Sequence, residues 1–205
     1  MDVINVTADA EEFTCNAYLV TGETSTLVDA GTMPGVESVV ADHVDGLDRV
    51  VLTHQHHDHV GELDAVLDAF DADLYAYGDH SRRTHELADG DTVAMGEESF
   101  DVVYTPGHAD DHVSLVSEHT LFSGDVVVYN DGAFDDGSFG RTDMAGQSRE
   151  RLVESLETLL DRLPDSVTSM YAGHGDAFHA ADESVRDVIE RALSRAERYE
   201  PKYQD

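Results

Sequence analysis

The sequence predicts an α/β fold in which sheets are covered by helices, a four-layer αββα sandwich in two similar halves. Short, β-branched apolar runs such as the one at 50–52 are typical of buried strands. Other stretches, most clearly 152–163, carry apolar residues at helical spacing. Strands and helices alternate in both halves and no linker interrupts the 205 residues, so we expect a single domain over 1–205.

The first half is predicted to open with strands at 3–6, 16–20 and 26–29. The turn-forming residues 22–25 indicate a hairpin between the last two. A helix is expected at 34–44, because Pro34 suits a first helical turn. The strand at 50–52 and a helix at 61–70 follow, and the polar stretch 80–87 is predicted as a helical turn or loop. Further strands are expected at 74–77, 92–95 and 100–104.

The second half is predicted to start with a hairpin of strands at 113–116 and 120–123. A long loop at 126–147 comes next, and loops of this length in compact domains are usually functional or disordered. Ser148 is a suitable N-cap for the helix that includes 152–163, and Pro164 stops it. The last strand is expected at 167–171 and the last helix at 185–196.

Charge is the unusual feature of the composition. Asp and Glu number 44 against 12 Lys and Arg, which gives a formal net charge of −32. The acids are scattered rather than gathered in one block, which favours a halophile-type surface that stays hydrated in concentrated salt over a docking face for a basic partner. The same charge argues against nucleic-acid binding, which needs a basic patch.

The sequence also favours a cytoplasmic protein. No apolar run approaches the roughly 20 residues of a membrane span, so we expect no membrane partner. The first residues lack the basic and apolar regions of a secretory signal. The single cysteine, Cys15, rules out an intramolecular disulfide, fits a reducing compartment, and is expected to be a small packed residue.

A cluster of metal-binding residue types follows the strand at 50–52. His54 and His56 are two residues apart, so an extended backbone points both the same way. Asp58 and His59 come after a turn and can face a second point. Imidazole nitrogen and carboxylate oxygen suit zinc, iron or manganese. A catalytic zinc needs three protein ligands and a water, so other parts of the chain should supply more ligands.

Three further candidates share one pattern, an apolar strand followed by small or turn-forming residues and then a ligand type. They are His108, Asp125 and His174. Glycine precedes each of them, and it lets the backbone turn sharply and approach an ion closely.

These motifs, in this order, resemble the metallo-β-lactamase superfamily over nearly the whole chain. The segment 139–143, Phe-Gly-Arg-Thr-Asp, narrows the resemblance to the short glyoxalase II-like (hydroxyacylglutathione hydrolase-like) thioesterases and to the persulfide dioxygenases. The resemblance implies one metal held by His54, His56 and His108. It implies a second held by Asp58, His59 and His174, with Asp125 bridging the two. β-Lactamases of this fold typically carry Arg where His59 stands, which argues against that activity.

The resemblance implies a dinuclear hydrolase of a small-molecule thioester or related ester, with zinc as the first choice of metal and iron or manganese next. Hydroxide held between the ions would attack the acyl carbon, and Asp58 would orient it as well as bind metal. The alternatives are a mononuclear iron persulfide dioxygenase, using His54, His108 and Asp125, a lactonase, and a metal-binding scaffold without activity.

Some residues near the motifs are candidates for substrate contact. Arg141 is one, although an ion pair with Asp143 that braces the loop is the favoured interpretation. Tyr129, Phe134 and Phe139 are expected either to line a pocket or to pack the loop.

Overall fold

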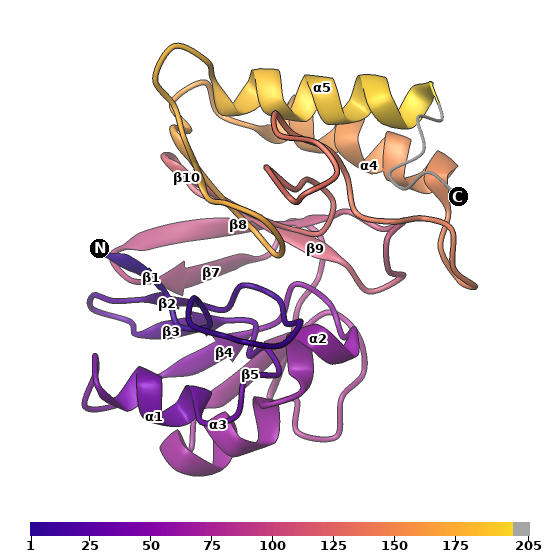
Figure 1. The fold of residues 1–205 in the computed structure, drawn as a ribbon. Coiled ribbons are helices and arrows are strands. Elements are labelled where there is room, and N and C mark those ends of the chain that lie inside the picture. Colours follow the sequence, from indigo (N-terminus) through magenta and orange to yellow (C-terminus); the bar gives the residue numbers. More distant parts are fainter. Residues whose placement is uncertain (199–205) are drawn as a thin grey trace. The chain divides into compact units, whose positions relative to one another are not determined.

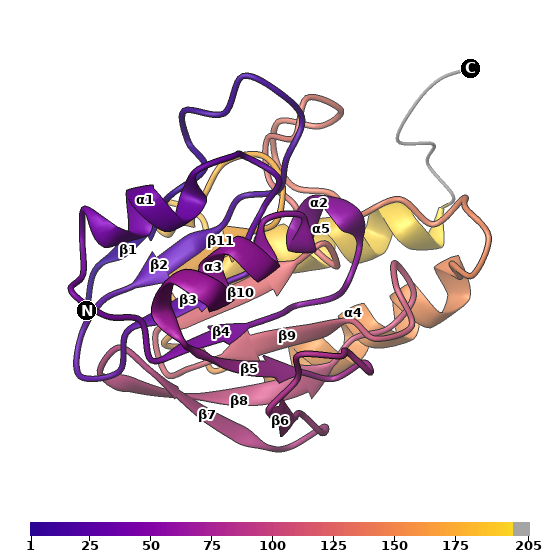
Figure 2. The same ribbon diagram turned by 90° about the horizontal axis from the view of Figure 1, so that it is seen from below.

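A computed structural model describes residues 1–198, which form two compact units, Met1–Val102 and a second that starts at Val103 (Figures 1 and 2). Each unit contributes sheet strands and covering helices. The predicted α/β class is confirmed: two mixed sheets are flanked by helices, as in an αββα sandwich. None of the helices within 1–198 is both long and apolar enough to cross a membrane.

The first unit contains a six-stranded sheet whose strands lie in sequence order. The strands are β1 (Val3–Asn5), β2 (Tyr18–Val20), β3 (Thr26–Val28), β4 (Arg49–Val51), β5 (Asp73–Ala76) and β6 (His85–Glu86). β1, β2 and β3 pair antiparallel, which confirms the hairpin, and β3 to β6 pair parallel. The parallel strands therefore end at one edge of the sheet, where ligand sites form in α/β proteins.

Helices α1 (Val36–Ala41) and α3 (Leu63–Phe70) cover this sheet, and the short α2 (His57–Val60) lies between β4 and α3 (Figure 1). Val40 of α1 and Val66 of α3 are fully buried and share one apolar core with Leu27 and Val50 of the sheet. This packing anchors both ends of the segment that carries the histidine cluster.

The second sheet has the order β12-β11-β10-β9-β8-β7, and β8 carries the boundary between the units. Its strands are β7 (Thr92–Met95), β8 (Glu98–Tyr104), β9 (Val113–Val116), β10 (Thr120–Gly124), β11 (Ser169–Ala172) and β12 (Phe178–His179). β10 pairs parallel with β11 and antiparallel with β9. Thus the end of β10 lies beside the start of β9.

Helices α4 (Arg149–Arg162) and α5 (Val185–Glu197) pack side by side over the strands of the second unit (Figure 1). Their apolar faces, including Leu156 and Ile189, join Leu121 and Met170 in one core. Ser148 caps α4 by accepting a hydrogen bond from the Arg151 amide, as predicted.

Several boundaries differ from the sequence-based prediction. The helix expected at 34–44 is the shorter α1, which starts after Gly35, a residue with φ of 89°. Part of the stretch 80–87 forms strand β6 rather than only a turn or loop, because it extends the first sheet beside β5. The strand expected at 167–171 is β11 and is not the last, since β12 follows and pairs with it.

Candidate metal centre

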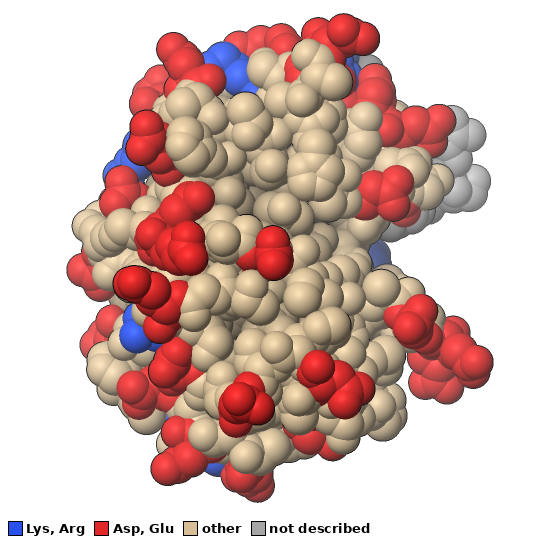
Figure 3. Space-filling view, turned by 90° about the vertical axis from the view of Figure 1, so that its left-hand side faces the viewer, with Lys and Arg blue, Asp and Glu red and all other residues tan. Residues whose placement is uncertain are grey.

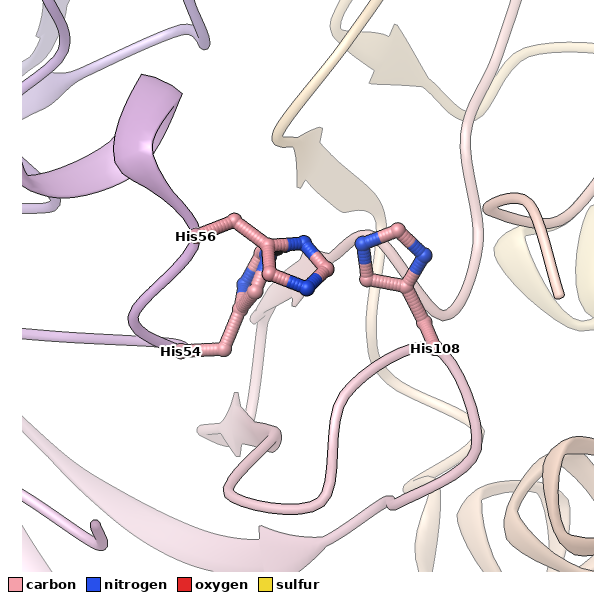
Figure 4. A group of neighbouring side chains, drawn as sticks. All are labelled: His54, His56 and His108. Atoms are coloured by element: carbon pink, nitrogen blue, oxygen red, sulfur yellow. Dashed lines mark hydrogen bonds between the residues drawn. The ribbon is translucent and has the colours of Figure 1, made fainter. Parts of the chain in front are cut away.

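The first group of candidate ligands lies directly after β4. Leu52 is buried and ends the apolar run, and His54 follows with 1% of its surface exposed. His54 Nε2 and His56 Nδ1 lie 3.1 Å apart, and the two rings face each other edge to plane (Figure 4). Asp58 and His59 lie on α2 rather than on an open loop, with His59 Nε2 3.9 Å from Asp58 Oδ2.

Asp29, at the end of β3, braces this group. Its carboxylate accepts hydrogen bonds from the Thr53 amide at 2.8 Å, the Thr53 hydroxyl at 2.7 Å and His59 Nδ1 at 2.8 Å. All three residues are buried. Asp29 has a φ of 58°, an uncommon conformation that aims its carboxylate at the loop. The turn after β3 thus braces the loop that carries the histidines.

These bonds decide which ring nitrogens carry protons. The Asp29 carboxylate can only accept hydrogen bonds, so His59 Nδ1 donates to it. The Thr53 hydroxyl also donates its proton to Asp29. Thr53 Oγ1 therefore accepts from His54 Nδ1, 3.1 Å away. In the neutral rings of His54 and His59 the lone pair is thus on Nε2. Hydrogen bonding at one ring nitrogen commonly prepares the other to bind metal.

The group fits a divalent metal by its donor chemistry. A tetrahedral ion with bonds of about 2.0–2.1 Å to nitrogen places two ligand atoms roughly 3.3 Å apart. His54 Nε2 and His56 Nδ1, at 3.1 Å, are close to that spacing. Two lone pairs at this distance repel each other, and a cation or a proton between the two nitrogens removes that repulsion.

The second unit holds the remaining candidates. His108 lies in the loop after β8, and its ring is labelled in Figure 4. Its Nδ1 donates to the Arg141 carbonyl at 2.8 Å, so the lone pair is again on Nε2. That Nε2 lies 3.2 Å from Asp125 Oδ2, and His174 Nε2 lies 3.5 Å from the same oxygen. His108, Asp125 and His174 therefore converge on one point within this unit.

The long loop after Asp125 holds these three residues in place. The Gly140 amide donates to the Asp125 carbonyl at 2.7 Å, and a Cβ at Gly140 would come within 2.2 Å of that oxygen. Arg141 supplies the carbonyl that orients His108. The Tyr129 carbonyl accepts from the Asp176 amide at 2.8 Å and thereby fixes the segment after His174.

Three of the four residues named as candidates for substrate contact, Phe139, Tyr129 and Arg141, occupy different surroundings. Phe139 is fully buried in the core, with the Arg149 guanidinium 4.6 Å from its ring centre. Tyr129 is partly buried against Phe178. Arg141 is exposed and makes two hydrogen bonds, at 2.9 and 3.0 Å, to Asp143, whose pKa this pairing lowers. The favoured bracing ion pair is therefore present.

The guanidinium of Arg195 lies over the ring of Phe134, with its central carbon 4.0 Å from the ring centre. Packing thus accounts for the surroundings of Phe134 and Phe139. Cys15 is a buried, packed residue, as expected, and it lies beside Asp29 and His59. His57 is exposed.

Sequence reasoning assigned no orienting role to Thr53 or Gly140 and favoured a structural role for His112, because the contacts of these residues join distant parts of the chain. Thr53 stands directly before the first histidine and Gly140 lies in the segment 139–143, so both positions offered a signal.

Comparisons with known proteins identify the family of the chain. A model of the metallo-beta-lactamase superfamily matches residues 10–174. The chain is 29% identical over 197 residues to a beta-lactamase-like protein 2 homolog of Caenorhabditis elegans, covering 88% of this chain and 62% of that protein. It is 30% identical over 152 residues to a hydroxyacylglutathione hydrolase of Aliivibrio fischeri, covering 72% of this chain and 56% of the enzyme. The chain thus spans about three-fifths of the length of these curated relatives.

Solved structures show the same likeness. The crystal structure of ETHE1 from Myxococcus xanthus has a TM-score of 0.74 and 25% identity, covering 98% of this chain and 92% of that one. The protein TTHA1623, solved in a di-iron-bound form, has a TM-score of 0.67 and 26% identity, covering 87% of this chain and 93% of that one.

Proposed function

Since the chain belongs to the metallo-β-lactamase superfamily, we propose that it is a dinuclear metallohydrolase that cleaves a thioester or related acyl ester. The observation that carries the proposal is the set of hydrogen-bond contacts at Nδ1 of His54, His59 and His108, which favours a lone pair on Nε2 in each ring. The similarity to the hydroxyacylglutathione hydrolase of Aliivibrio fischeri supports the thioester as substrate class.

We assign the metals as the family pattern implies. One would be held by His54, His56 and His108, and the other by Asp58, His59 and His174, with Asp125 shared. Zinc suits this mixture of imidazole and carboxylate ligands, and the di-iron form of a similar protein keeps iron as a choice. When bound, a pair of such ions supplies an activated water and polarises the substrate carbonyl.

The chain's own residues would do the rest. Asp29 and the Arg141 carbonyl keep the imidazoles in the tautomer that binds metal, and each is itself held by the fold. Asp58, which is partly exposed, would accept a hydrogen bond from the attacking water and so fix the direction of attack on the acyl carbon. The thiolate or alkoxide then leaves and takes up a proton from solvent.

The test combines metal counting with rates for protein purified without chelator in molar salt. A hydroxyacyl thioester of glutathione, a simple acyl thioester and a lactone serve as substrates. We expect two metals per chain, turnover that disappears with a strong chelator, and recovery with zinc or manganese. Activity that survives thorough metal removal would sink the proposal, and bound metal without turnover of any substrate would point to an inactive scaffold.

Asp58→Ala should lose one metal, and the rate should fall on the order of a hundred-fold, as when a strong positioning or electrostatic group is removed. His54→Ala should lose metal in any metal-dependent version. His57→Ala is the matched control, because His57 lies on the same short helix but is exposed. One iron in both the wild type and Asp58→Ala, with persulfide-dependent oxygen uptake, would instead identify the iron dioxygenase.

A further inference from the structure

A series of buried hydrogen bonds leads to the backbone amide of Asp125. The Asp125 amide donates to His112 Nε2 at 3.0 Å, and His112 Nδ1 lies 2.8 Å from Thr105 Oγ1. Thr105 Oγ1 lies 3.1 Å from Ser114 Oγ, which donates to the Ser123 carbonyl at 3.4 Å. Each of the five residues joined by these hydrogen bonds has at most 4% of its surface exposed.

The direction of each bond follows from the two ends. The amide of Asp125 can only donate, so His112 Nε2 accepts and the ring proton is on Nδ1. Thr105 Oγ1 then accepts from Nδ1 and its own proton points to Ser114. The Ser123 carbonyl, which can only accept, ends the series. One arrangement of protons satisfies every member, and networks of this kind stabilise a unique geometry.

The series crosses three neighbouring strands. Thr105 directly follows β8, His112 directly precedes β9, and Asp125 directly follows β10. Its hydrogen bond to His112 fixes the Asp125 amide, and the Gly140 amide fixes the Asp125 carbonyl. Hydrogen bonds therefore hold both the amide and the carbonyl of Asp125, independently of its carboxylate.

We propose that His112 is a positioning residue. It sets the direction of the Asp125 carboxylate by accepting a hydrogen bond from the Asp125 amide, and the bonds through Thr105 and Ser114 hold its ring in place. The inference rests on the proposed function in one respect, the use of Asp125 as the shared metal ligand. It predicts that the His112 ring carries its proton on Nδ1 and accepts a hydrogen bond through Nε2.

The first test needs no metal and no substrate. Two-bond proton–nitrogen correlation spectra of metal-free protein labelled at histidine nitrogen should show His112 protonated on Nδ1 and unprotonated on Nε2. A ring protonated on Nε2 would contradict this arrangement of hydrogen bonds, whatever the protein's activity.

Two substitutions separate the role of the acceptor from that of mere packing. His112→Gln can place a carbonyl oxygen near the position of Nε2, whereas His112→Asn is too short and reaches only the Nδ1 side. We expect the Asp125 amide in metal-free protein to exchange with solvent at least about ten-fold faster in the Asn variant than in the Gln variant. Metal affinity and kcat should fall about 10–100-fold in the Asn variant, as for other residues that orient ligands, with KM little changed. The Gln variant should stay within a few-fold of wild type.

The same pair of substitutions at His119 is the control, because His119 is exposed in the turn between β9 and β10. Both His119 variants should match wild type. Equal effects of Asn and Gln at position 112 would contradict the positioning role. If Asp125→Asn binds as much metal and turns over as fast as wild type, the metal assignment is wrong. The spectra of His112 would still test the proposed hydrogen bonds independently.

Discussion

At the scale of single residues, the site depends on where a few protons lie. His59 donates to Asp29, His54 to Thr53 and His108 to the Arg141 carbonyl, and each bond leaves a lone pair on Nε2. None of these acceptors is among the seven residues assigned to the two metals, although Asp29 lies close to Cys15 and His59. The residues that select the tautomer are thus separate from those that would bind metal, and they act before any ion arrives.

Gly140 offers a sharp test at this scale. A Cβ there would lie 2.2 Å from the Asp125 carbonyl oxygen and 2.8 Å from His108 Nδ1. The carbonyl belongs to the backbone and cannot rotate away, so we expect Gly140→Ala to destabilise the protein by about 1–3 kcal/mol and to weaken metal binding. Denaturant unfolding and metal titration measure both effects.

Gly46→Ala is the matched control for that change. A Cβ at Gly46 meets no atom within 4 Å, and its backbone is not in the left-handed region. Its free energy of unfolding should stay within about 0.5 kcal/mol of wild type, as for surface changes in general. Equal stability of the two variants would show that the close approach at Gly140 is not needed.

At the scale of elements, the ligands follow the ends of strands and the braces come from turns and loops. The expected pattern of strand, turn-forming residue and ligand describes His108 after β8 and Asp125 after β10. The loop at 126–147 adds a second layer of support, because it returns to the Asp125 carbonyl and to His108. Strand ends bring the ligand residues near the site, and the loop sets their orientation.

Helix α5 permits a test through pH. Asp187 and Ser184 form a capping box at its start, and the hydrogen bonds from the Ser184 hydroxyl and amide lower the pKa of Asp187. A carboxylate whose folded pKa lies below its unfolded value of about 3.9 stabilises the fold above that pH and loses this effect as pH falls through the folded pKa. Asp187→Asn should therefore melt at a lower temperature than wild type at pH 7, and the difference should shrink below pH about 4.

Asp182→Asn serves as the control, because Asp182 is exposed just before the helix and outside the capping box. It should show the same melting temperature as wild type at both pH values. A gap between wild type and Asp187→Asn that stays constant into acid would mean that the ionised cap does not contribute.

The sequence predicted element type well where apolar spacing was strong. The residues of α4 and α5 repeat apolar positions at helical spacing, and both helices lie where expected. Prediction failed for β6, because its polar residues carry no strand pattern and pair only by extending an existing sheet. The candidate ligands stood out by residue type, whereas Gly140 and His112 act through contacts with residues distant in sequence, which one sequence does not reveal.

For the whole molecule, charge is the dominant property. On the face shown in Figure 3, acidic side chains are scattered over the surface and basic ones are few. Several arginines are engaged by acids, as Arg82 is by Asp64 and Asp68. With a net charge of −32, these pairs leave most of the acidic charge uncompensated.

We therefore expect the melting temperature to rise with salt. Salt weakens both attraction and repulsion between exposed charges, with a screening length of about 10 Å at 0.1 M, and repulsion is the larger effect at this net charge. Each 1 kcal/mol of relieved repulsion corresponds to about 2–4 °C in a protein of this size. Thermal melts from 0.05 to about 2 M potassium chloride measure the effect, with sucrose as an uncharged control. A flat response to salt would mean that the acids are compensated locally.

The contacts of α5 also bear on when the site can form during synthesis. Arg191 and Arg195 pair with Asp136, and Arg195 also donates to the Gly137 carbonyl, so the last helix holds the middle of the loop that braces Asp125 and His108. A nascent chain lacks both arginines until residue 195 has been translated, well after the loop and the candidate ligands His108, Asp125 and His174. The contacts that hold the loop therefore form only after these ligands are already part of the chain, so a fixed ligand geometry in the second unit has to wait for α5.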